Sequence, residues 1–84
     1  MRLDKFLKIT RLIKRRTLAK EVADQGRITI NGNKAKASSK VNVGDELTIQ
    51  YGQKYVTVRV NALKEHVKKD EVDTLYEIIN EEKR

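Results

Sequence analysis

The first 20 residues hold eight lysine and arginine side chains at a spacing that could gather phosphate groups. A guanidinium holds two phosphate oxygens through parallel hydrogen bonds, and the N–H groups at a helix start add further donors. We expect two short helices and their connection to bring these cations onto one surface. The predicted phosphate-binding residues are Arg2, Lys5, Lys8, Arg11, Lys14, Arg15, Arg16 and Lys20.

The charge of the chain is divided unevenly between its two halves. Residues 1–40 carry 12 lysines and arginines against 3 acids, whereas residues 41–84 carry 7 against 9, within a formal net charge of +7. Such a field attracts nucleic acid or an anionic membrane face, and it carries no information about the fold. The N-terminal half is therefore predicted to meet a polyanion.

The sequence lacks the residues of common catalytic and metal sites. Its one histidine, His66, lies in the charged stretch "KEHVKK", where we expect it to be solvated, and there is no cysteine. Zinc sites need several histidine or cysteine ligands, and the four glycines are too far apart to cradle a phosphate. We therefore predict a protein that is not an enzyme and that has no cofactor and no metal.

The N-terminal stretch "MRLDKFLKIT" interrupts each short apolar run with a charge. This pattern fits neither a signal peptide nor a stop-transfer segment, and no run approaches the roughly 20 apolar residues of a membrane helix. The absence of cysteine is compatible with a reducing compartment. We expect a soluble, cytoplasmic protein without a membrane partner.

Two amphipathic helices are predicted to carry the cations. Leu3, Phe6 and Leu7 follow the helical spacing, and "LAKEVA" from residue 18 to 23 places Leu18, Ala19, Val22 and Ala23 on one stripe. Gly26 is predicted to end the second helix, because glycine takes the left-handed conformation after a helix without a side-chain penalty.

After Gly26 the apolar period becomes that of strands. Ile28 and Ile30 alternate with polar residues before Asn31-Gly32, a strong signal for a tight hairpin turn. Alternation returns in "ELTIQY" and "KYVTVRV", over residues 46–51 and 54–60. These segments predict a small, mostly antiparallel sheet.

The last 15 residues return to a helical spacing, with Val72, Leu75, Tyr76 and Ile79 at i, i+3, i+4 and i+7. We predict an acidic C-terminal helix over 70–84, directed away from phosphate. The expected fold class is α+β: two N-terminal helices on a small sheet, plus this C-terminal helix. Residues 1–84 form a single domain in this interpretation, with a core over 1–50, an added strand and connection over 51–69, and the helix over 70–84.

Folded RNA fits the basic surface better than its competitors. A DNA-binding helix-turn-helix needs a second helix directly after the turn at Gly26, but residues 27–30 alternate like a strand. The chain has three tyrosines and one phenylalanine, too few and too scattered to form stacking platforms for single strands. A membrane-surface role requires bulky apolar residues exposed beside the lysines, and here the core needs them.

Three stretches carry a resemblance to a known family. "RLDKFL" at 2–7, "RRTLAKEVADQGRITINGNKAKAS" at 15–38 and "VNVGDELTI" at 41–49 resemble the RNA-binding domain named after small-subunit ribosomal protein four, the S-four domain with its alpha-L fold. The whole chain is similar to the stand-alone bacterial S-four proteins of the RqcP (YabO) type, relatives of the small ribosome-associated heat-shock protein.

This resemblance implies a function in ribosome-associated quality control. The implied partners are the ribosomal RNA of the large (50S) subunit, the peptidyl-tRNA that obstructs it, and an RqcH-type factor that extends the stalled chain with untemplated alanine. The protein is expected to act as a monomer. The module alone also fits a general ribosome-associated or assembly factor, and an RNA-affinity subunit for a separate RNA-modifying enzyme.

The resemblance also assigns roles to individual residues. The basic RNA contacts of the family fall on Arg2 and Arg16. The place of five further cations on the basic surface, and not the resemblance, makes them supporting candidates: Lys5, Lys8, Arg11, Arg15 and Lys20. Asp4 is predicted to be structural, either as a cap or as the partner of a nearby cation. Arg15 stands where many S-four domains have a serine that caps the second helix, so that cap is in doubt and Arg15 is a candidate phosphate contact.

Overall fold

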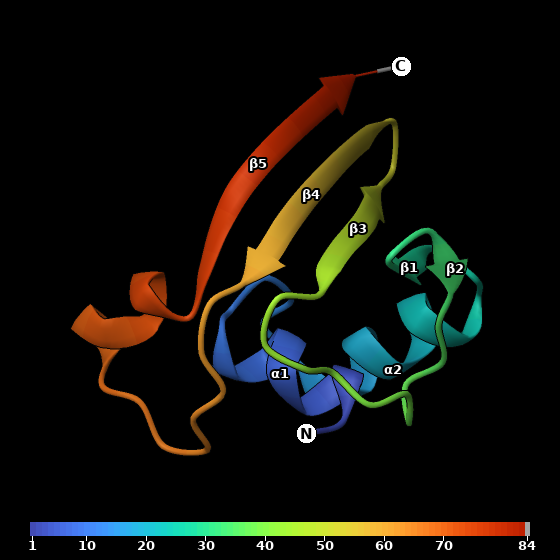
Figure 1. The fold of residues 1–84 in the computed structure, drawn as a ribbon. Helices are drawn as coiled ribbons and strands as arrows, with labels where there is room; N and C mark the ends of the chain where they lie inside the picture. Colours follow the sequence, from blue (N-terminus) through green and yellow to red (C-terminus); the bar gives the residue numbers. More distant parts are fainter. Residues whose placement is uncertain (84) are drawn as a thin grey trace.

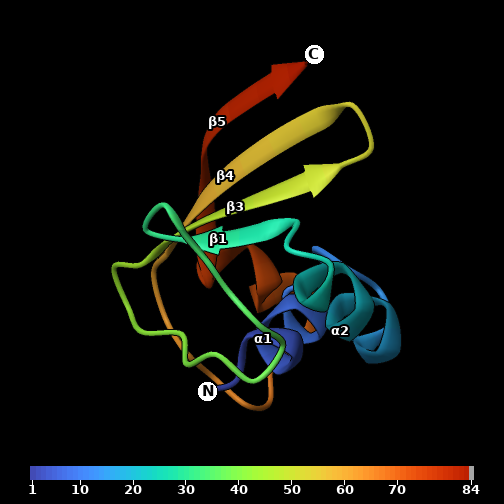
Figure 2. The same cartoon turned by 90° about the vertical axis from the view of Figure 1, so that its right-hand side faces the viewer.

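The computed structural model describes residues 1–83, in which two helices lie against one end of a five-stranded antiparallel sheet, with the edge strand β5 extending away from them (Figures 1 and 2). The strand order is β2-β1-β3-β4-β5, and the predicted α+β class is confirmed. The elements are α1 (Leu3–Ile9), α2 (Arg16–Asp24), β1 (Ile28–Ile30), β2 (Asn33–Lys34), β3 (Glu46–Tyr51), β4 (Lys54–Val60), the 3-10 helix η1 (Lys69–Thr74) and β5 (Tyr76–Lys83). Within these residues, no helix has the length and apolar character to cross a membrane.

The two helices bury different kinds of side chain. Leu3, Phe6 and Leu7 of α1 are buried, as their spacing predicts. From α2 only the small Ala19 and Ala23 are fully buried. Leu18 was predicted to face inward, but it is 47% exposed, which corrects that expectation. Burial limited to alanines leaves α2 on the rim of the core, so its polar flanks remain accessible.

The predicted hairpins and strands are present. Asn31 and Gly32 have φ of 52° and 87°, the two positive values that a type I′ turn requires between β1 and β2. The Asn31 side chain also accepts a hydrogen bond from the Glu46 N–H (2.9 Å), which joins this turn to the start of β3. The alternating aliphatic residues of β3 and β4 are buried in one core cluster with residues of both helices.

The predicted C-terminal helix is wrong. Among residues 70–83 only those of η1 are helical, and residues 76–83 form the edge strand β5, paired with β4 from Val60↔Tyr76 to Lys54↔Lys83; residue 84 lies outside the described residues. Val72 and Leu75 are buried, because a spacing of three residues also suits a 3-10 turn. The open edge of β4 provides hydrogen-bond partners for the backbone of this segment. Its Tyr76 and two isoleucines also favour a strand, so strand pairing prevails over the helical spacing of the apolar residues.

Candidate nucleic-acid interface

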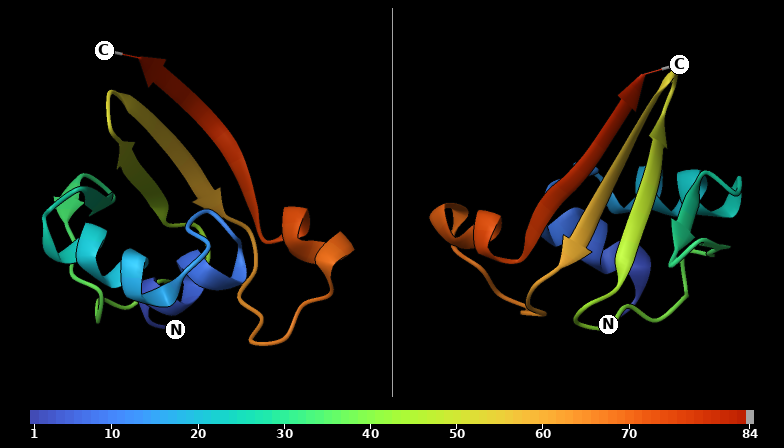
Figure 3. Two further views of the ribbon diagram at one scale, coloured as in Figure 1. Left: turned by 180° about the vertical axis from the view of Figure 1, so that it is seen from behind. Right: turned by 45° about the horizontal axis from the view of Figure 1, so that its top comes forward.

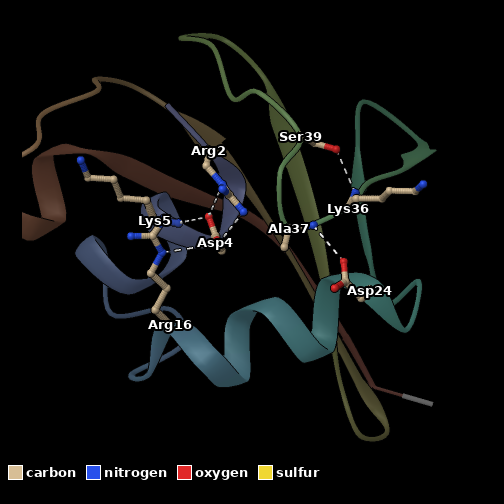
Figure 4. Close-up of polar contacts among 8 residues, drawn as sticks. All are labelled: Arg2, Asp4, Lys5, Arg16, Asp24, Lys36, Ala37 and Ser39. Atoms are coloured by element: carbon tan, nitrogen blue, oxygen red, sulfur yellow. Dashed lines mark hydrogen bonds and ion pairs between the residues drawn. The ribbon is translucent and has the colours of Figure 1, made fainter.

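Two arginines distant in the sequence converge on one buried carboxylate. Arg2 Nε lies 3.3 Å from Asp4 Oδ1, and Arg16 Nε lies 3.4 Å from Asp4 Oδ2 (Figure 4). The Asp4 side chain is 4% exposed, whereas those of Arg2 and Arg16 are 53% and 46% exposed. The prediction that Asp4 pairs with a nearby cation is confirmed, and the carboxylate fixes both guanidinium groups at the surface.

Backbone hydrogen bonds anchor the carboxylate itself. The N–H groups of Leu3 and Asp4 donate to the carbonyl groups of Ser39 (2.8 Å) and Ala37 (3.1 Å), and the Lys5 N–H donates to Asp4 Oδ1 (2.8 Å). At the far end of α2, Asp24 Oδ1 accepts a hydrogen bond from the Ala37 N–H (3.2 Å; Figure 4). The segment over residues 37–39 is thus hydrogen-bonded both to the start of α1 and to the end of α2.

The start of α2 lacks a side-chain cap. Arg15 occupies the N-cap position in an extended conformation, and its side chain makes no capping hydrogen bond within the described part of the chain. Its exposed side chain and the N-terminal end of α2 present positive charge together. The helix therefore begins without the side-chain cap that a serine would provide, while contact between Arg15 and phosphate stays a prediction.

The connection between the helices begins with a strained residue. Arg11 has φ of 60°, in the left-handed region that glycine usually occupies after a helix. The preceding turn is closed by the Thr10 hydroxyl, which is buried and donates to the Phe6 carbonyl (2.8 Å). Non-glycine residues in this conformation concentrate at functional sites, where their side chain is needed.

Most of the predicted cations surround one hollow. It has a volume of about 720 Å³ and lies between α1, the connection to α2, and the segment before and within η1. Seen from behind (Figure 3, left), the connection faces the segment between β4 and η1. We call it the basic hollow, after five of its lining residues: Lys5, Lys8, Arg11, Lys14 and Arg16.

The remaining three predicted cations lie outside this lining. Arg2 neighbours the hollow, because it shares the carboxylate of Asp4 with Arg16. Arg15 and Lys20 are exposed and do not line the hollow. The structure thus brings five of the eight cations to one hollow with Arg2 beside it, and contact of the eight with RNA remains a prediction.

The opposite wall of the basic hollow comes from residues that the sequence did not suggest. This wall is formed by Glu65, His66, Val67 and Val72, and Ile9 of α1 completes the lining. Lys5 Nζ donates a hydrogen bond to Glu65 Oε1 (3.0 Å) and lowers the pKa of the Glu65 carboxyl, while also tying this wall to α1. His66 is exposed, as expected, but it borders the hollow. Within residues 1–83, no three histidine, cysteine or acidic side chains gather as a metal site.

Known proteins match both the sequence and the fold. The family model described as the S4 domain matches residues 1–47. The chain is 71% identical over 83 residues to the "RQC P-site tRNA stabilizing factor" of Bacillus subtilis, covering 99% of this chain and 96% of that protein. The protein of the same name from Halalkalibacterium halodurans is 66% identical over 82 residues, covering 98% and 93%.

A solved structure matches most of the chain. The trimeric structure of Vibrio cholerae Heat Shock Protein 15 has a TM-score of 0.85 and 30% sequence identity, covering 93% of this chain and 80% of that one. The resemblance read from "RLDKFL" and the stretches after it is confirmed. The chain therefore belongs to the S4-domain family of proteins that carry the name RQC P-site tRNA stabilizing factor.

Proposed function

We propose that this protein is an RNA-binding factor of ribosome-associated quality control. It binds large ribosomal subunits obstructed by peptidyl-tRNA and contacts both the ribosomal RNA and the tRNA. The names of its relatives support the quality-control role and the P-site tRNA as a target. The basic surface supports recognition through phosphates, which dominates affinity in protein–nucleic acid complexes.

The observation that carries this proposal is the pair of arginines held by Asp4. A flexible arginine loses side-chain entropy when it binds a phosphate. Arg2 and Arg16 are already oriented by ion pairs to a buried carboxylate, and about half of each side chain remains exposed. Arg2 faces Asp4 with both its Nε atom and one amino group, which donates to Asp4 Oδ2 (3.3 Å), whereas Arg16 faces it with Nε. We infer that the remaining amino groups of the two half-exposed guanidinium groups are available to a phosphate.

The proposed mechanism is positional and involves no covalent chemistry. By bridging ribosomal RNA and tRNA, the protein lengthens the time that peptidyl-tRNA stays in one position on the subunit. A tRNA held in this way allows an RqcH-type factor to add untemplated alanine to the stalled chain. In this proposal the protein acts as a cytoplasmic monomer and not as an enzyme.

The test is co-sedimentation of tagged protein with large subunits that carry or lack peptidyl-tRNA, at two salt concentrations. We expect preferential binding to the occupied subunits and weaker binding at higher salt, because each neutralised phosphate steepens log affinity against log salt by about 0.7 to 0.9. Addition of the RqcH-type factor then measures alanine incorporation with and without the protein.

Two results would contradict parts of the proposal. Equal binding to occupied and empty subunits would leave a general ribosomal RNA-binding factor. Binding that does not respond to salt would overturn the phosphate-based mechanism. Co-purification in a fixed ratio with an RNA-modifying enzyme would favour a subunit that supplies RNA affinity to that enzyme.

A further inference from the structure

One wall of the basic hollow is apolar, a property that phosphate binding does not require. Val72 is buried and Val67 is half-buried where they line the hollow across from α1, and the half-buried Ile9 adds an apolar group at the end of α1. Phosphates are recognised by charge and hydrogen bonds, whereas the faces of unpaired bases pack against apolar and aromatic side chains. The combination of cations and apolar groups matches a whole nucleotide.

The same wall contains an acid, which a site for phosphate alone would avoid. Glu65 is 67% exposed in the hollow, and its Oε1 atom already accepts a hydrogen bond from Lys5. A carboxylate repels phosphate, but it accepts hydrogen bonds from the exocyclic amino group of a base. Glu65 therefore adds an acceptor suited to a base edge.

The size of the basic hollow and the position of His66 agree with this occupant. A volume of about 720 Å³ falls within the range of roughly 300 to 1,000 Å³ that is typical of small-ligand pockets. His66 borders the hollow, and its planar ring is one of the side chains on which unstacked bases stack. Arg11, Lys8 and Lys14 supply the charge for the adjoining phosphates.

We propose that the basic hollow binds one unstacked nucleotide of the RNA that the protein contacts, with its base against Val67, Val72 and His66 and its phosphates toward Lys8, Arg11 and Lys14. The inference rests on the proposed function, because it takes the basic surface to be the RNA-binding surface. Such a site would add selectivity for an unpaired nucleotide to the contacts that the other cations make with the RNA backbone. The base-binding wall lies outside the S4 match at residues 1–47.

Val67→Lys separates base binding from phosphate binding. The substitution replaces an apolar wall residue with a cation, so it opposes a base while favouring the RNA backbone. Val43→Lys is the matched control, since Val43 is 61% exposed and does not line the hollow. His66→Ala is a second variant, in case Val67→Lys perturbs the fold, and thermal melts establish that each variant is folded.

The experiment combines co-sedimentation with base-specific chemical probing of large subunits carrying peptidyl-tRNA. With the wild-type protein and with Val43→Lys, we expect one nucleotide to become unreactive at its Watson–Crick edge. With Val67→Lys, that nucleotide regains its reactivity although the protein still sediments with the subunit. His66→Ala should weaken subunit binding by about fivefold, near the lower end of the contribution of one stacked base.

The outcomes distinguish this inference from the proposed function. Subunit binding without protection of any single base would overturn the nucleotide site and leave the proposed function standing. Protection that persists in both Val67→Lys and His66→Ala would have the same two consequences. Loss of alanine tailing in Val67→Lys without any change in base reactivity would assign the hollow to a protein partner and overturn the inference. No binding to the subunit at all would contradict the proposed function itself.

Discussion

Ion pairs of similar length lie at two places in this molecule, and their burial differs. At the N-terminus, Arg2 and Arg16 share the buried carboxylate of Asp4 at 3.3 and 3.4 Å. On the sheet, Arg59 pairs with Glu77 at 3.2 Å, with both side chains about half exposed. The first arrangement orients two cations around a fixed anion, whereas the second links neighbouring strands through two solvated groups.

This difference shows that distance alone does not define the role of an ion pair. Exposed pairs contribute about 0 to 1 kcal/mol, because water screens them and both side chains lose freedom. A buried acceptor such as Asp4 is costly to leave without partners, so it keeps its cations in place. The N-terminal cluster is therefore suited to hold side chains ready for a ligand, and the sheet pair is suited to support strand pairing.

The largest effect is expected for Asp4→Ala. Loss of the carboxylate removes the acceptor of the Lys5 N–H and frees both arginines, and we expect the free energy of unfolding to fall by about 1 to 3 kcal/mol. Subunit binding should also weaken, although the substitution removes a negative charge from an RNA-binding surface. Urea denaturation and co-sedimentation measure the two effects, and tighter binding would contradict the positioning role.

Arg16→Ala should weaken subunit binding with little loss of stability. The arginine is half exposed and its ion pair is partly screened, so the free energy of unfolding should change by less than about 1 kcal/mol. The slope of log affinity against log salt should decrease by about 0.7 to 0.9 for the lost phosphate contact. Arg59→Ala on β4 is the matched control, and an equal loss of binding there would mean that only net charge matters.

Arg11→Gly should weaken RNA binding without lowering the stability of the fold. Glycine is favoured at the positive φ of this position, so the stability should stay the same or rise by up to about 1 kcal/mol. RNA binding should weaken, because one cation leaves the basic hollow. If this variant binds as tightly as the wild type, the strained arginine has no part in RNA contact.

The last prediction concerns Tyr51, whose effect is absent at neutral pH and emerges only at alkaline pH. Burial, followed by the nearby Tyr76, raises the pKa of Tyr51 to about 12, and its hydroxyl donates a hydrogen bond to the Leu12 carbonyl at 2.7 Å. The folded state thus holds this proton more tightly than the unfolded chain, in which the pKa is 10.0. The contribution of Tyr51 to stability is complete below pH 10 and decreases as the pH rises toward 12. Denaturation at several pH values should show a smaller decrease for Tyr51→Phe, and an identical decrease would contradict the assignment.

Local patterns in the sequence were sufficient for much of the fold. The spacing of Leu3, Phe6 and Leu7 gave the inward face of α1, and Asn31-Gly32 gave the first hairpin, because turn chemistry and periodicity act over a few residues. The same reasoning failed at β5. There the free edge of β4, distant along the chain, determines the conformation of a segment whose own period also suits a helix.

The candidate site also has a part that the sequence predicted and a part that it did not. Its cations and the structural role of Asp4 could be inferred from residue type, spacing and family resemblance. The wall formed by Glu65, His66 and Val67 could not, since only the path of the chain after β4 brings these residues to the basic hollow. Among the cations, the sequence could not separate those that line this hollow from the three that lie outside its lining, Arg2, Arg15 and Lys20.

The most direct test of the central claim is a mutant cycle that measures the affinity for large subunits carrying peptidyl-tRNA. Asp4→Ala is introduced into the wild-type protein and into a variant in which Arg2 and Arg16 are both alanine. If Asp4 acts through the two arginines, it weakens binding in the first background and causes no further weakening in the second, beyond the roughly 0.3 to 0.5 kcal/mol within which independent sites add. An equal loss of affinity in both backgrounds would contradict the claim that this carboxylate holds the arginines for RNA.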